Sequence, residues 1–109
     1  MELIKTTFTD KKDIYRTTKN NAIAKLSDVS DNSPLDVMGY TLFKDENKDG
    51  KEVRILSIML ANGDVYATNS ATAIENFNDI MDIFEDLPLT IYKGTGTSKN
   101  GRAYIYLYV

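Results

Sequence analysis

Residues Val53–Asp86 decide the fold and read VRILSIMLANGDVYATNSATAIENFNDIMDIFED. Two apolar runs, Val53–Leu60 and Asp64–Asn69, flank the dipeptide Asn62-Gly63. This dipeptide is a strong hairpin signal, because a type I′ turn needs positive φ at both central residues and Asn and Gly tolerate it. The pattern predicts two antiparallel strands joined by a type I′ turn.

A helix is predicted directly after this hairpin. Thr72 and Glu75 have the spacing of a capping box, in which the hydroxyl accepts a hydrogen bond from a backbone amide and the carboxylate reaches back to the cap. The helix should therefore begin at Ala73, and Pro88 should end it near Asp86. The apolar residues at helical spacing form one stripe, made up of Ile74, Phe77, Ile80, Met81, Ile83, Phe84 and Leu87. Of these we expect Phe77, Met81 and Phe84 to be buried.

Three further β segments complete the expected sheet. Leu35–Phe43 is β-rich, with Gly39 at a position where a strand bends or carries a bulge. Leu89–Lys93 alternates as a strand, the run from Gly94 to Ser98 looks flexible, and Ala103–Val109 puts its aliphatic residues on one face and its tyrosines on the other. The order β-β-β-α-β-β predicts a mainly β, five-stranded OB-like antiparallel barrel with the helix between strands three and four. A small α+β sandwich is the alternative.

The first third of the chain is predicted to be a separate extension. We assign residues 1–33 to a partly helical N-terminal extension and residues 34–109 to the OB-like domain. Asp10–Val29 carries apolar residues at roughly helical intervals, with Thr9 or Asp10 as the cap of one or two short helices. Ser30–Pro34 has the composition of a linker.

Composition excludes several classes of protein. The 109 residues include no cysteine and no histidine, which removes disulfides, thiol chemistry and zinc ribbons. No apolar run is long enough for a transmembrane helix, and the first residues lack the layout of a signal peptide, so we expect a cytoplasmic protein that does not bind membranes.

No catalytic or metal site is predicted. The carboxylates form no compact pair in an apolar frame, so we expect neither enzymatic activity nor a cofactor. Asp45-x-Asn47-x-Asp49-Gly50 imitates the first half of an EF-hand loop, but Leu56 stands where the bidentate glutamate belongs.

The charges are unevenly distributed although the net charge is only −3. Residues 71–86 contain five acids and no base, whereas residues 87–109 contain three bases and no acid. This separation permits a basic surface on an acidic protein.

The chain resembles the small single-stranded-DNA-binding proteins of phages and mobile elements of Gram-positive bacteria. The resemblance rests on Gly39–Phe43 with the charged loop after it, Ile55–Ile58, Asn62–Ser70, the helix around Phe77 and Ile80, and the closing hairpin Gly96–Arg102. It covers Leu35–Val109 and part of the extension. It implies an OB-like protein that coats single-stranded DNA in replication or recombination, in the cytoplasm of the host cell. Oligomeric state, DNA or RNA preference and contacts with replication proteins stay open.

The residues themselves point to the same ligand. Single-strand binding needs aromatic faces for stacking and cations for phosphates, and Tyr104 and Tyr106 lie two apart beside Arg102 and Lys99. The predicted nucleic-acid-binding set is Tyr40, Lys44, Arg54, Tyr66, Lys93, Lys99, Arg102, Tyr104 and Tyr106.

Two other interpretations compete with this one. Alternating tyrosines also occur on ordinary half-exposed sheets, or on a second packing face, which the N-terminal extension could cover here. The alternative function is a protein-interaction domain that docks a replication or defence partner through the tyrosine face or the acidic helix.

Overall fold

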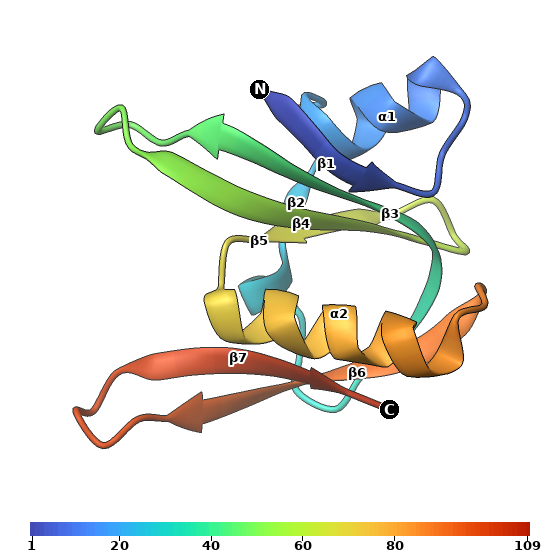
Figure 1. The fold of residues 1–109 in the computed structure, drawn as a ribbon. Coiled ribbons are helices and arrows are strands. Elements are labelled where there is room, and N and C mark those ends of the chain that lie inside the picture. Colours follow the sequence, from blue (N-terminus) through green and yellow to red (C-terminus); the bar gives the residue numbers. More distant parts are fainter.

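One strongly curled sheet wraps around a single central helix (Figure 1). The computed structural model describes all residues, 1–109. The elements in chain order are β1 (Glu2–Thr6), α1 (Lys11–Thr18), β2 (Ala24–Lys25), the short 3-10 helix η1 (Leu26–Asp28), β3 (Pro34–Glu46), β4 (Glu52–Leu60), β5 (Val65–Thr68), α2 (Ala71–Phe84), β6 (Leu89–Thr97) and β7 (Ala103–Tyr108). The protein is therefore mainly β, as the sequence predicts.

The sheet has seven strands, so the expected number of five is wrong. The strand order is β2-β5-β4-β3-β6-β7, and β1 pairs with β3 outside this path. The five expected strands are β3 to β7, with α2 between β5 and β6 in the chain. The two additional strands, β1 and β2, come from residues 1–33.

The long strand β3 produces the curl. Its first residues, Pro34–Val37, pair with β6, whereas its later residues, Thr41–Lys44, pair with β1. β4 pairs along most of β3 on the other edge. Since β5 and β7 are not paired, the sheet forms a curled half-barrel rather than a closed barrel.

Gly39 lies where β3 bends, as expected. The register of the β3–β4 pair shifts between Val37 and Gly39, which is the signature of a bulge. A Cβ atom on Gly39 would lie 2.5 Å from Cζ of Phe8 and 2.8 Å from Oγ1 of Thr7. The missing side chain therefore lets the segment after β1 cross the bend, where the Thr7 amide donates to the Tyr40 carbonyl oxygen.

The expected hairpin forms, but its turn is not type I′. Only Gly63 has positive φ, at 91°, whereas the Asn62 backbone does not. The Asn62 side chain instead accepts a hydrogen bond from the Asp64 amide at 2.9 Å. Asn62 thus stabilises the turn through its side chain rather than through a left-handed backbone.

The caps of α2 also differ from the expected capping box. Ser70, not Thr72, is the N-cap, and its hydroxyl accepts from the Ala73 amide. α2 therefore begins two residues earlier than predicted, at Ala71. It ends at Phe84, before Asp86, because Glu85 adopts the left-handed C-cap conformation with φ of 62°. In the extension, Asp10 caps α1 as expected.

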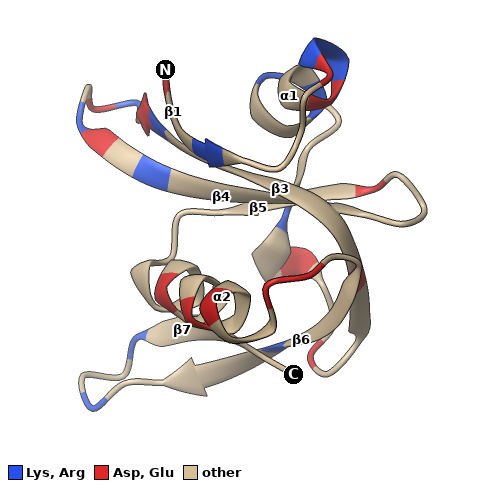
Figure 2. Ribbon diagram, turned by 45° about the vertical axis from the view of Figure 1, so that its right-hand side comes forward, with Lys and Arg blue, Asp and Glu red and all other residues tan.

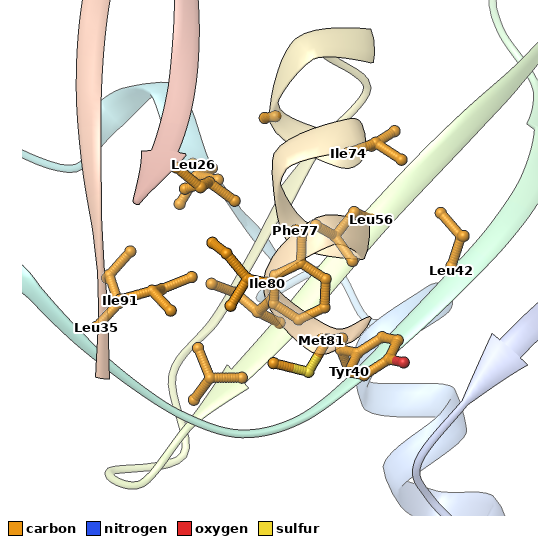
Figure 3. Packing of buried hydrophobic residues seen from close by; sticks show 14 of the residues in the cluster. Leu26, Leu35, Tyr40, Leu42, Leu56, Ile74, Phe77, Ile80, Met81 and Ile91 are labelled. Carbon is orange, nitrogen blue, oxygen red and sulfur yellow. The ribbon is translucent and has the colours of Figure 1, made fainter. Parts of the chain in front are cut away.

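The core lies between α2 and the concave face of the sheet (Figure 3). Phe77 is fully buried at its centre, and the Tyr40 ring meets it edge to face at a centroid distance of 4.8 Å. Met81 is buried as predicted, but Phe84 is 42% exposed and Ile83 is 75% exposed. The apolar stripe thus extends beyond the part of the helix that the sheet covers.

Of the N-terminal elements, β1 and β2 belong to the sheet and Leu26 of η1 lies in the core, whereas α1 packs on the convex side of the sheet (Figure 1). α1 contacts β3, β4 and β5, and its buried Thr17 hydroxyl shares a hydrogen bond with the Thr41 hydroxyl at 2.9 Å. No helix of the structure combines the length and the apolar character needed to cross a bilayer.

Candidate nucleic-acid interface

Four tyrosines form a continuous row on one face of the β6–β7 hairpin, and we call this row the tyrosine ladder. It consists of Tyr104, Tyr106, Tyr108 and Tyr92. Successive ring centroids are 6.2 Å apart from Tyr104 to Tyr106, 5.9 Å from Tyr106 to Tyr108 and 5.5 Å from Tyr108 to Tyr92. The last pair is stacked, with 25° between the ring planes.

The alternation of β7 directs the ladder away from the core. Leu107 is buried in the core cluster and Ile105 packs against it, so the alternate residues face outward. Tyr104 and Tyr106 are 40% and 36% exposed, which confirms the expectation that they point outward. The extension leaves their rings uncovered, because α1 and β1 pack on other strands. The Tyr108 hydroxyl donates to the Asn32 side chain.

Two glycines of β6 make room for the exposed rings. A Cβ atom on Gly94 would lie 2.3 Å from Cζ of Tyr106, and one on Gly96 would lie 2.5 Å from Cζ of Tyr104. Each ring therefore lies across the bare backbone of the opposite glycine, which holds it in place. The expectation of a flexible Gly94–Ser98 arm is wrong, because β6 continues to Thr97.

Cations lie at the tip of the same hairpin (Figure 2). Lys99 and Arg102 are exposed around the turn that joins β6 to β7, and neither forms an ion pair. Figure 2 also shows the acidic residues of α2 on the other side of this hairpin, toward the inside of the curled sheet. The tip of the hairpin and the ladder therefore join free positive charge to exposed aromatic rings.

Two further predicted cations belong to the β3–β4 hairpin. Lys44 and Arg54 are opposite each other in the register of this hairpin. Lys44 pairs with Glu52 at 3.4 Å and with Glu2 at 3.9 Å. Arg54 is exposed and lines a hollow together with Glu75 of α2. Carboxylates thus offset much of the positive charge of this pair.

The rings of Tyr40 and Tyr66 pack in or against the hydrophobic core. Tyr40 is only 3% exposed and belongs to the core, so its ring has no free face for a base. Tyr66 is half-buried and packs against the core cluster. We leave Tyr40 out of the proposed interface for this reason.

Lys93 is also buried, with 2% of its surface exposed. Its ammonium group lies 2.9 Å from a carboxylate oxygen of Asp31 and donates to the Val29 carbonyl oxygen at 2.5 Å. The hydrogen bonds from Lys93 and from the Thr95 hydroxyl hold the pKa of Asp31 below its usual range. The expected linker is therefore fastened to β6, and Lys93 is not free to meet a phosphate.

A broad hollow of about 840 Å³ lies beside the ladder, in the open part of the half-barrel. Its lining includes Lys25 of β2, Thr68 of β5, Ser70 at the start of α2, and Tyr104 and Ile105 of β7. Lys25 is exposed and forms no ion pair. The hollow thus connects one end of the ladder to an unpaired cation on another strand.

Sequence reasoning left Tyr92, Tyr108, the two glycines and Lys25 out of the binding set, although it placed Tyr108 on the same face of the last strand as Tyr104 and Tyr106. The position of the turn Lys99–Gly101 could have predicted the two tyrosines and the two glycines, because it fixes the register of the hairpin. A hairpin centred on Asn100 aligns Tyr92 with Tyr108, Gly94 with Tyr106 and Gly96 with Tyr104, as the structure shows. Lys25 gave no such signal, because β2 has two residues and pairs with a strand about forty positions away.

One comparison with known proteins identifies a family. The family model described as "Phage Single-stranded DNA-binding protein" matches residues 5–109. No curated protein and no solved structure matches the chain. The match includes every helix and strand of the structure except the first residues of β1.

Proposed function

Since the chain belongs to the phage single-stranded DNA-binding protein family, we propose that it coats single-stranded DNA during the replication or recombination of a phage or mobile element. It binds the strand in the host cytoplasm and catalyses no reaction on it. The observation that carries the proposal is the tyrosine ladder, in which the rings of Tyr104 and Tyr106 are partly exposed on the outer face of the β6–β7 hairpin.

The ladder supplies the stacking part of the binding energy. Base–aromatic stacking contributes about 1–3 kcal/mol per base and tolerates any sequence, because every base has a π-face. Gly94 and Gly96 support the inner side of the rings, so the rings are ordered before DNA arrives. A preorganised ring loses little side-chain entropy on binding.

Phosphate charge supplies the other part. Lys99 and Arg102 at the hairpin tip and Lys25 in the hollow are free of ion pairs. The acids of α2 do not oppose them on the ladder face, since the β6–β7 hairpin stands between α2 and that face. Leu107 packs with Phe77 in one cluster, while the tyrosines point the other way.

We also propose that the half-barrel is an OB-like fold. Two features support this assignment: the order of β3 to β7 with α2 inserted between β5 and β6, and the bulge at Gly39 in the first of these strands.

Replacing Arg102 with glutamate tests the phosphate part of the proposal. Titration of an unstructured homopolymer, followed by tyrosine fluorescence at several salt concentrations, should give weaker binding. The slope of log K against log salt should be flatter by about 0.7 for each phosphate that the variant no longer neutralises.

Lys48→Glu is the matched control, because it makes the same charge change in the β3–β4 turn, where we place no DNA. It should leave the salt slope close to that of the wild type. If Arg102→Glu leaves the slope unchanged as well, the phosphate-binding cations lie elsewhere or the ligand is not a polyanion.

A further inference from the structure

The helix α1 presents a basic face with an exposed aromatic ring, and the ladder does not account for it. This α1 face consists of Lys11, Lys12, Tyr15 and Arg16, all of them exposed. Tyr15 is 57% exposed, more than any other tyrosine of the chain. Figure 2 shows α1, with its Lys and Arg residues and one acidic residue, outside the curled sheet.

The packing of α1 leaves this face free. The helix attaches to the sheet through its opposite side, where Thr17 is fully buried and Ile14 is half-buried. Lys11 and Lys12 form no ion pair, and Arg16 pairs only with Asp13 of the same helix, at 3.1 Å with both side chains partly exposed. Such an exposed pair contributes little and is easily exchanged for a phosphate.

A chain of hollows connects the α1 face with the ladder. The hollow on α1 is lined by the α1 face and Asn20. A second hollow shares Arg16 and Asn20 with the first and extends to Ala24 of β2. The next residue, Lys25, lines the large hollow that also contains Tyr104. The three hollows thus form a continuous path from the α1 face, past Ala24 and Lys25 at the edge of the sheet, to the tyrosine ladder.

We propose that the same DNA strand continues from the ladder across Lys25 and along the α1 face. Lys11, Lys12 and Arg16 would bind phosphates there, and Tyr15 would stack on a base. This inference rests on the proposed function and adds a second binding region to it. A polyanion fits this path because its exposed cations outnumber its acids. The lining includes one carboxylate, Asp64, which already accepts a hydrogen bond from the Asn62 side chain.

The dimensions set the length of DNA that the path requires. The helix α1 and the strand β7 lie on opposite sides of the molecule (Figure 1), whose longest extent is 42 Å. A strand of that length has about 12 nucleotides at the duplex spacing of about 3.4 Å per nucleotide, and fewer when the single strand is more extended. This falls in the range of about 4–16 nucleotides found for single OB-folds. A strand of about 5 nucleotides would cover the ladder and not reach α1.

The test compares two oligothymidylates, of about 5 and about 16 nucleotides, on the full chain with Lys11→Glu and Lys12→Glu combined. Glutamate suits the first turn of a helix, so α1 should stay folded. Affinity for the short strand should stay within about twofold. Affinity for the long strand should fall roughly tenfold, and its salt slope should be flatter by about 1.4, because two phosphates are no longer neutralised.

Two further variants complete the design. Lys48→Glu combined with Lys51→Glu makes the same change of charge in the β3–β4 turn and should not produce a loss of affinity restricted to the long strand. Tyr15→Leu, which keeps the charge, should lower affinity for the long strand roughly fivefold or more.

The outcomes separate this inference from the proposed function. An equal loss of affinity for both strands, no loss for either, or the same length-dependent loss in the β3–β4 control would overturn the binding of DNA by α1. The proposed function would stand in each case as long as the wild type binds the short strand. It would fail only if the wild type bound neither strand.

Discussion

Replacing Tyr104 and Tyr106 together with leucine should weaken binding to a short oligothymidylate by about 2–6 kcal/mol, because two bases each lose about 1–3 kcal/mol of stacking. Leucine keeps apolar bulk on the outer face but removes the aromatic ring. The free energy of unfolding should change little, since both rings lie outside the core cluster and leucine keeps apolar contact with the β6 backbone. Affinity by tyrosine fluorescence or calorimetry and stability by urea titration measure the two effects separately.

Phe84→Leu is the control for this variant, because Phe84 is an aromatic residue of similar exposure at the far end of α2. It should leave the affinity unchanged. Gly96→Ala tests the same stacking contact in another way, since its Cβ atom would displace the Tyr104 ring without removing it. This variant should also weaken binding to the short oligothymidylate. If the leucine variant loses stability or self-association while DNA affinity is intact, the ladder is a packing or docking surface, and Arg54 and Tyr66 become the candidates.

Truncating Phe77 to alanine should cost about 3–5 kcal/mol of stability, the usual loss for a buried aromatic residue in a core. Phe77 is fully buried between α2 and the sheet, and it carries the edge contact with Tyr40. A domain of this size has about 5–15 kcal/mol of stability in total. The variant should therefore unfold at much lower urea concentration, as circular dichroism can follow.

Ile83→Ala is the matched comparison in the same helix, because Ile83 is 75% exposed. Its effect should stay within about 0.5 kcal/mol. Equal effects of the two substitutions would mean that α2 does not fill the sheet as described.

Local patterns predicted the elements whose signals lie close together in the chain. The five strands β3 to β7, the helix between β5 and β6, the bulge at Gly39 and the outward direction of Tyr104 and Tyr106 all follow from short-range alternation, turns and glycines. The predicted ends of α2 were wrong by one or two residues, because the residues that cap it could not be told from their neighbours in the sequence. Ser70 capped α2 in place of Thr72, and Glu85 ended it before Asp86.

Long-range partners explain what could not be predicted. β1 reads as a strand only because β3 offers it an edge some forty residues later. Lys93 has the appearance of a surface cation until Asp31 and the Val29 carbonyl oxygen, more than sixty residues earlier, enclose its ammonium group. Tyr40 belongs to the core because Phe77 lies against it. Alternation alone does not say which face of a curled sheet the helix covers.

Nuclear magnetic resonance of ring-labelled tyrosine tests the stacking claim most directly, since the chain has seven tyrosines and Tyr40 is a buried internal control. On addition of a short oligothymidylate, the ring signals of Tyr104 and Tyr106 should shift upfield, because each ring then lies against a base, while those of Tyr40 should stay in place. Ladder signals that do not move at saturating DNA, with Tyr66 shifted instead, would contradict the account.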